Sequence, residues 1–186
     1  GSMHNIVLCG GQGRKLWPLS QTDTPKQFLS FGTEDSHYLK TIKRNLPLCD
    51  KTVVITDQKY SETADRQIMD ANIDAEIILE PSGKKTAASI AMACMLYPAQ
   101  TFLVTPSDHE ISDEEAYAEA VSKAEKLAED GHIVLFGIDG QVPEKRYGYF
   151  KTDGENITHF HEKPDEETAG KYLEEGYFVN RGIMCF

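Results

Sequence analysis

The sequence predicts an α/β fold in which helices flank a Rossmann-like, doubly wound and mainly parallel sheet. Short apolar runs alternate with amphipathic stretches along the chain, which is typical of strand–helix–strand units. The apolar runs are continuous rather than alternating, as expected for strands buried on both faces. Gly10, Glu80 and Asp108 fall just after three of these runs. Ligands of such sheets bind at the carboxyl ends of strands, so we expect these residues to gather at one edge of the sheet.

The individual elements follow from these patterns. Strands are expected at 5–9, 52–56, 76–79, 101–105 and 132–137. Helices are expected near 36–46, 60–71, 86–97, 113–130 and 166–175. The fourth helix has the clearest signals, because Ser112 and Glu115 form a capping box and Gly131 can end it. One face of that helix carries Tyr117, Val121, Ala124 and Ala128, as a core-facing stripe requires.

The pattern changes after Gly137. The segments 147–151, 157–161 and 178–186 read as alternating strands with one acidic helix between them, and they are interpreted as an extension of the same domain. A glycine such as Gly148 inside a strand marks a bulge or a close ligand approach. A sheet that ended at Phe186 would have an unpaired edge, which predicts a homo-oligomer or marginal stability.

Composition narrows the possible partners. The chain has 186 residues, 40% of them hydrophobic, which is enough for one domain with a sizeable core. A net charge of −11 argues against a nucleic-acid partner, and no apolar run approaches the length that crosses a membrane. Residues 1–3 resemble the remnant of an expression tag, so the domain is expected to cover 4–186.

The four cysteines indicate in which cellular compartment the protein works. Cys9, Cys49, Cys94 and Cys185 lie among apolar residues and show neither metal nor redox spacing. Such cysteines are typical of reduced core thiols, so the sequence predicts a cytoplasmic protein.

The loop after the first predicted strand is the most informative segment. It contains Gly10, Gly11, Gly13, Arg14 and Lys15. Bare backbone N–H groups and cations together hold polyphosphates. A P-loop is excluded because no hydroxyl residue follows the lysine, and Leu16 stands where a dinucleotide fingerprint needs its third glycine. The sequence therefore predicts a loop that wraps a nucleoside triphosphate, with a tight turn and solvated cations as the alternative.

A longer string around this loop is more specific. Residues 10–20 read Gly-Gly-Gln-Gly-Arg-Lys-Leu-Trp-Pro-Leu-Ser, and residues 25–28 read Pro-Lys-Gln-Phe. They resemble the signature of the nucleotidyltransferases that make nucleoside-diphosphate sugars, and look most like mannose-1-phosphate guanylyltransferases. The resemblance implies a nucleotide-diphospho-sugar transferase fold, Mg²⁺ as cofactor, and GTP and mannose 1-phosphate as substrates. It covers residues 4–186, whereas the family's domain continues further, so the sheet is expected to be C-terminally incomplete.

The same resemblance implies roles for single residues. Catalysis would involve Arg14 and Lys15 on the triphosphate, Lys26 on the α-phosphate, and Asp108 on the metal. The nucleotide would be bound by Leu8, Gly10, Gly11, Gly13, Glu80, Pro81, Thr86, Ala87 and Ser107. The sugar would be bound by Gly148, Glu162, Lys163 and Asn180. Without the resemblance, an aspartate after a strand is more often a helix cap or a turn residue.

Departures from the family keep two alternatives open. The family usually has a small hydroxyl residue and then arginine at the positions of Arg14 and Lys15. It also differs at Lys85, Val179 and Arg181, so another base or sugar is possible, as in a thymidylyl- or adenylyltransferase. The family's second metal-binding aspartate lies beyond Phe186. A non-catalytic domain that senses nucleotide sugars is therefore the other alternative.

Overall fold

The computed structural model describes residues 1–9, 26–30, 32, 34–80, 86–108, 111, 113–137, 147–151, 157–160 and 182–186. Its strands are β1 (Met3–Cys9), β2 (Lys51–Asp57), β3 (Glu76–Glu80), β4 (Thr101–Pro106), β5 (His132–Gly137), β6 (Tyr147–Lys151), β7 (Ile157–Phe160) and β8 (Gly182–Cys185). Its helices are α1 (His37–Asn45), α2 (Gln58–Asp70), α3 (Thr86–Leu96) and α4 (Glu114–Glu129), with a 3-10 turn, η2, at Lys26–Phe28. The predicted helix at 166–175 falls outside these ranges.

The described strands form one sheet in the order β3-β2-β1-β4-β8-β5-β6-β7. The pairs from β3 to β4 are parallel, whereas the pairs from β4 to β7 are antiparallel. The doubly wound α/β prediction is confirmed, but the sheet is mixed rather than mainly parallel. Parallel neighbours need a crossover of a dozen or more residues. The connections 138–146, between β5 and β6, and 152–156, between β6 and β7, are shorter than that.

Strand β8 lies inside the sheet. It pairs with β4 on one side and with β5 on the other, and all four of its residues are buried. Beyond it, the Phe102 N–H donates to the Phe186 carbonyl at 2.7 Å, and the Phe186 N–H donates back at 3.0 Å. The expectation of an unpaired edge at Phe186 is therefore wrong, because the described edge strands are β3 and β7.

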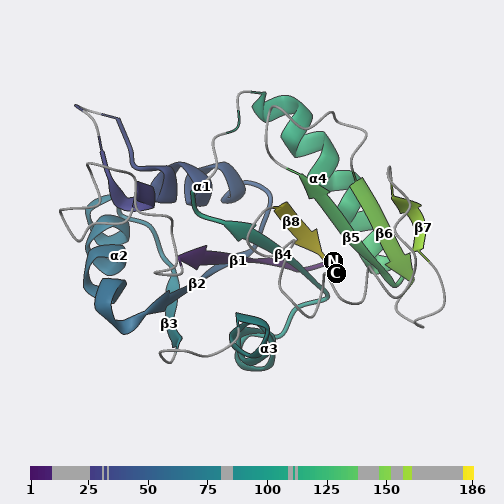
Figure 1. Cartoon of the computed structure of the whole chain (residues 1–186), viewed down its shortest axis with the longest axis horizontal. Coiled ribbons are helices and arrows are strands. Elements are labelled where there is room, and N and C mark those ends of the chain that lie inside the picture. The colour runs from purple at the N-terminus through teal and green to yellow at the C-terminus, as the bar shows by residue number, and fades with distance from the viewer. Residues whose placement is uncertain are drawn as a thin grey trace.

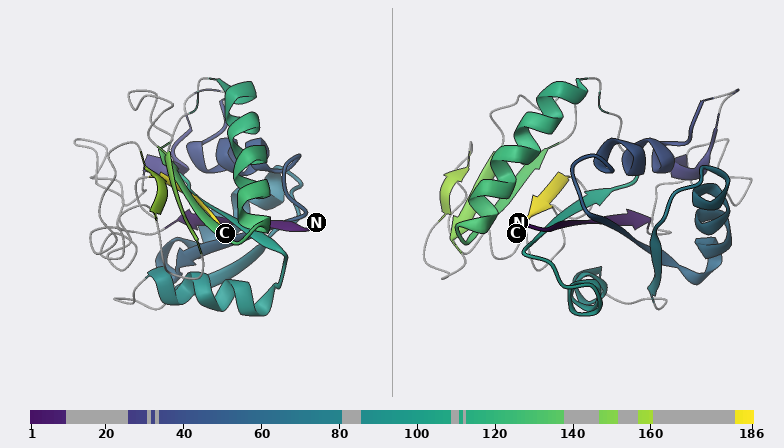
Figure 2. Two further views of the ribbon diagram at one scale, coloured as in Figure 1. Left: turned by 90° about the vertical axis from the view of Figure 1, so that its right-hand side faces the viewer. Right: turned by 180° about the vertical axis from the view of Figure 1, so that it is seen from behind.

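Helices cover both faces of the sheet (Figure 1). Helix α3 lies on one face, where Ile90 and Ala93 pack against β1, β2 and β4. Helices α1, α2 and α4 lie on the opposite face, as Figure 2 shows from behind. The predicted face of α4 is confirmed, because Tyr117, Val121 and Ala124 are buried and Ala128 packs beside them. No helix in the described ranges is long and apolar enough to cross a membrane.

The ends of α4 show which signals fix a helix. Asp113, not Ser112, is the N-cap, and its side chain accepts a hydrogen bond from the Ala116 N–H. The predicted capping box is wrong because aspartate one residue later caps equally well and adds a negative charge at the helix N-terminus. Gly131 does follow the helix, with φ 91°, a left-handed conformation that costs glycine little.

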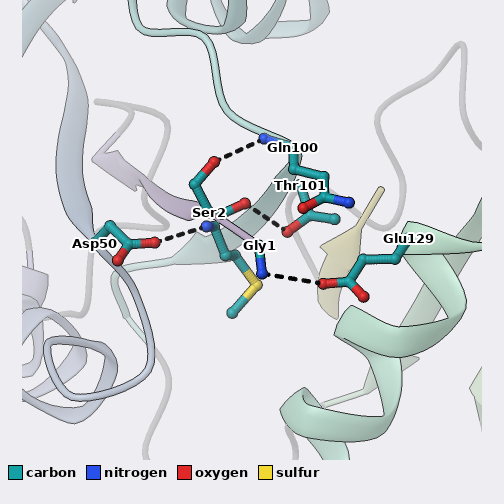
Figure 3. Close-up of polar contacts among 7 residues, drawn as sticks. Gly1, Ser2, Asp50, Gln100, Thr101 and Glu129 are labelled. Atoms are coloured by element: carbon teal, nitrogen blue, oxygen red, sulfur yellow. Dashed lines mark hydrogen bonds and ion pairs between the residues drawn. The ribbon is translucent and has the colours of Figure 1, made fainter.

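The N-terminus takes part in the sheet (Figure 3). The Met3 N–H donates to the Asp50 carboxylate at 2.9 Å, and Met3 is 1% exposed. The Ser2 carbonyl accepts from the Thr101 N–H at 3.0 Å. Strand β1 therefore begins at Met3, one residue before the predicted start of the domain, since a buried apolar side chain and paired backbone groups extend a strand regardless of their origin.

The buried thiols should make the stability of the folded protein depend on pH. Burial raises the pKa of Cys9 and of Cys185 from 9.0 to about 12. Above pH 9 the unfolded chain loses thiol protons that the folded chain keeps, so the free energy of unfolding falls as pH rises towards 12. Urea unfolding between pH 8 and pH 10.5 should show this fall, by up to about 1.4 kcal/mol per pH unit and group. Cys9→Ala should flatten the slope, and an unchanged slope would contradict the prediction.

Candidate functional site

The candidate site lies at one edge of the sheet. Strands β1 to β4 are parallel, so their last residues, Cys9, Asp57, Glu80 and Pro106, share that edge. The chain passes outward from β1 through β2 to β3 and then returns to the other side of β1 as β4. The strand order therefore reverses between β1 and β4, and such switch points are where α/β sheets bind ligands.

Ser107 and Asp108 follow β4 directly and lie at the switch point. The Ser107 N–H donates to the Leu8 carbonyl at 3.2 Å, and the Ser107 side chain hydrogen-bonds the Cys9 thiol. Ser107 is 2% exposed, whereas Asp108 is half-buried. The charge of Asp108 also helps to raise the pKa of Cys9, after burial. Asp108 is therefore held beside the end of β1, where the glycine loop begins.

The chemistry of Asp108 fits a magnesium ligand. Mg²⁺ binds through one or two carboxylates, with substrate phosphates and waters completing its shell. Within the part of the chain that the structure describes, no group of three or more His, Cys, Asp or Glu side chains could hold a metal ion. A site built on Asp108 and the nucleotide phosphates needs no such group.

A second cluster surrounds Glu80 at the end of β3. Glu80 pairs with Asp57 in the sheet register, and the side chains of Thr86 and Ser89 on α3 hydrogen-bond it. Burial raises the pKa of the Glu80 carboxyl, and the charge of Asp57 raises it further. Its Oε1 atom is buried without a hydrogen-bond partner among the described residues. This oxygen can therefore accept a hydrogen bond from a ligand N–H group.

The structure brings the predicted site residues into two groups. Leu8, Ser107 and Asp108 lie together at the switch point, whereas Glu80, Thr86 and Ala87 lie at the end of β3 and the start of α3. Strand β3 is two strands from β1 and three from β4, which corresponds to about 10–15 Å, a distance that a nucleotide can bridge. Gly148 lies elsewhere, since β6 is separated from β4 by β5 and β8.

The predicted bulge at Gly148 is displaced by one residue. Gly148 itself pairs with Leu135 in β5 and with Phe160 in β7. The register shifts between Tyr149 and Phe150. Contact between Gly148 and a sugar stays a prediction.

Nine predicted residues lie outside the described ranges. They are Gly10, Gly11, Gly13, Arg14, Lys15, Pro81, Glu162, Lys163 and Asn180, and their roles stay predictions. Lys26 lies in η2, and its role is also untested. Sequence reasoning missed Asp57 and Ser89. Asp57 directly follows the predicted strand 52–56, and Asp108 comes three residues after the predicted strand 101–105. The pattern of a carboxylate after a strand could therefore have found Asp57 as well.

A comparison with protein families shows to which family the chain is related. A family model described as nucleotidyl transferase matches residues 4–186. The chain belongs to this family.

Curated relatives of this nucleotidyl transferase agree with the resemblance noted in the sequence. The chain is 38% identical to the xanthan biosynthesis protein XanB of Xanthomonas campestris, 37% to the mannose-1-phosphate guanylyltransferase of Salmonella montevideo and 34% to the alginate biosynthesis protein AlgA of Pseudomonas aeruginosa. Each match covers 97% of this chain but only 41–42% of the relative. The chain thus spans about two fifths of the length of these proteins.

Solved structures confirm the fold. A mannose-6-phosphate isomerase from Helicobacter pylori is 30% identical with a TM-score of 0.67, and the match covers all of this chain and 70% of that one. A mannose-1-phosphate geranyltransferase from Thermus thermophilus is 25% identical with a TM-score of 0.63, and the match covers all of this chain and 57% of that one. The nucleotidyl transferase therefore has the Rossmann-like nucleotide-diphospho-sugar transferase fold that the sequence predicts.

Proposed function

We propose that this chain catalyses nucleotidyl transfer of the mannose-1-phosphate guanylyltransferase type, in which GTP and mannose 1-phosphate give GDP-mannose and pyrophosphate. The observation that carries the proposal is the position of Asp108, held beside the end of β1 at the switch point of the sheet. The relative from Salmonella montevideo, which bears this enzyme's name, supports the choice of substrates.

The reaction is an in-line displacement at phosphorus. A phosphate oxygen of mannose 1-phosphate forms a bond to the α-phosphorus of GTP. The bond from that phosphorus to the oxygen bridging the α- and β-phosphates breaks, and pyrophosphate leaves with the electron pair. The attacking phosphate is already mostly ionised at neutral pH, so the reaction needs no general base. Catalysis then consists of positioning and charge neutralisation.

The residues divide this work between them. Arg14 and Lys15 bind the triphosphate, and Lys26 offsets the charge that develops on the α-phosphate. Asp108 is the protein ligand for Mg²⁺, which supplies positive charge to the phosphates when it is bound. Glu162, Lys163 and Asn180 orient the sugar phosphate. Glu80 offers its buried oxygen to an N–H group of the nucleotide.

The alternatives rest on residues that depart from the family pattern. Lys85, Val179 and Arg181 leave room for another base or sugar, and a domain that binds nucleotide sugars without turnover is the non-enzymatic candidate. We propose a cytoplasmic location because its four cysteines are free, as is usual in a reducing compartment. A homo-oligomer stays a proposal, which light scattering of the purified chain tests.

Release of pyrophosphate tests the proposed function. GTP, ATP, dTTP and UTP are each combined with mannose 1-phosphate or glucose 1-phosphate, with magnesium or with excess EDTA. We expect release that requires magnesium and is fastest with GTP and mannose 1-phosphate. A faster reaction with another pair would support the related transferase. GTP or GDP-mannose binding without release from any pair would contradict the catalytic proposal for this chain.

A further inference from the structure

The turn η2, which carries Lys26, is short and needs support from outside. It has three residues, Lys26–Phe28, and a 3-10 turn of this length makes few hydrogen bonds of its own. Its position is therefore set by the elements that pack against it, which are helices α1 and α2.

The ring of Phe28 makes the apolar part of this contact. Phe28 is 3% exposed. Its ring centroid lies 5.0 Å from that of Tyr38 on α1 and 6.3 Å from that of Tyr60 on α2. Cys9, the last residue of β1, belongs to the same buried cluster. The turn is thus packed against the cluster that includes the end of β1.

A single amide makes the polar part of the contact. Gln67, a half-buried residue of α2, donates from Nε2 to the Phe28 carbonyl at 2.9 Å. Its Oε1 accepts a hydrogen bond from the hydroxyl of Ser36 at 2.5 Å. The same Ser36 hydroxyl caps α1 by accepting from the Leu39 N–H at 3.2 Å. The Gln67 amide therefore ties together α2, the start of α1 and the turn.

We propose that Gln67 is a positioning residue for nucleotidyl transfer, which acts by fixing the turn that carries Lys26. The proposal rests on the proposed function, because the contact of Lys26 with the α-phosphate is part of it. A packed ring alone allows rotation and sliding, whereas a hydrogen bond to the Phe28 carbonyl fixes the backbone two residues after Lys26. Since small misplacements of a reacting group cost large factors in rate, the amide affects turnover without touching substrate.

A double-mutant cycle distinguishes positioning from general stability. Gln67→Met keeps the length of the side chain and removes both hydrogen bonds. We expect it to lower kcat roughly tenfold to 100-fold, with the KM for mannose 1-phosphate unchanged. In a Lys26→Ala background the same change should have almost no further effect, since the group it positions is gone. Fold losses that multiply would overturn the proposal.

The matched control lies on the same helix. Gln58 is an exposed residue at the start of α2, and Gln58→Met makes the identical chemical change. We expect its kcat to stay at the wild-type value. All rates are measured well below the melting temperature of each variant, so that the lower stability expected of Gln67→Met does not reduce the folded fraction. An equal loss of kcat in both glutamine variants would overturn the proposal.

A readout that does not need turnover separates this inference from the proposed function. Acylation of the Lys26 amine is followed by mass spectrometry with and without GTP. We expect GTP to protect Lys26 in the wild type and in Gln58→Met but not in Gln67→Met. If no substrate pair gives turnover but this pattern holds, the proposed function fails, whereas the role of Gln67 in positioning Lys26 against the nucleotide stands. Equal protection of Lys26 in all three proteins would overturn the positioning role.

Discussion

Replacing Asp108 by asparagine is expected to lower the turnover for pyrophosphate release by about 100-fold or more. The amide keeps the size of the side chain but removes the negative charge that binds magnesium, and removing one electrostatic contact in a transition state costs roughly 100- to 1,000-fold. Lys26→Ala should also remove most activity, because the charge developing on the α-phosphate loses its counter-charge. Steady-state kinetics with GTP and mannose 1-phosphate measures both effects.

Asp70→Asn is the matched control for the change at Asp108. Asp70 is exposed and ends α2, so it lies at the opposite edge of the sheet from the carboxyl ends of the strands. This variant should keep wild-type turnover. Titration with magnesium adds a second measure, since Asp108→Asn should need far more metal for half-maximal rate. Wild-type turnover in either Asp108→Asn or Lys26→Ala would show that its assigned role is wrong.

Replacing Asn45 by alanine is expected to lower the free energy of unfolding by about 2–4 kcal/mol. Asn45 is fully buried. Its Nδ2 donates to Asn5 Oδ1 at 3.1 Å and to Thr105 Oγ1 at 3.3 Å, and its Oδ1 accepts from the Tyr117 hydroxyl at 2.5 Å. Alanine would leave the Asn5 and Tyr117 groups without this partner in a dry interior, where unpaired polar groups are costly.

Tyr117→Phe provides a graded comparison. It deletes only the hydroxyl that donates to Asn45 Oδ1, so we expect a loss of about 1 kcal/mol. Urea unfolding followed by circular dichroism measures both variants. Equal small losses from the two changes would mean that water enters the site and replaces the missing partners, which would contradict the dry network inferred here.

This network was invisible in the sequence. Asn5 stands in an apolar run that predicts a buried strand, and nothing local says which group will satisfy its amide. Its partners are Leu103, Thr105 and Asn45, which are distant along the chain. Buried polar groups must be paired, but the sequence alone does not give the partner. The same holds for Gln67, whose two hydrogen bonds reach back to residues 28 and 36.

The candidate site was more predictable than the network. Glu80 and Asp108 were expected at one edge of the sheet because both follow apolar runs, and parallel strands share their carboxyl edge. The structure confirms that edge for β1, β3 and β4. The glycine loop and the sugar-side residues from 161 to 181 lie outside the described ranges, so their geometry stays a prediction.

Local sequence signals were enough to predict the type and order of most elements and to point to the nucleotidyl transferase family. Continuous apolar runs and amphipathic stretches are local signals, and an element needs only its own residues to display them. The position of β8 between β4 and β5 and the support that Gln67 gives to the turn at Lys26 became apparent only in the folded chain. Strand partners and side-chain hydrogen bonds depend on residues far apart in the chain, whose encounter is settled by packing of the whole core rather than by local propensity.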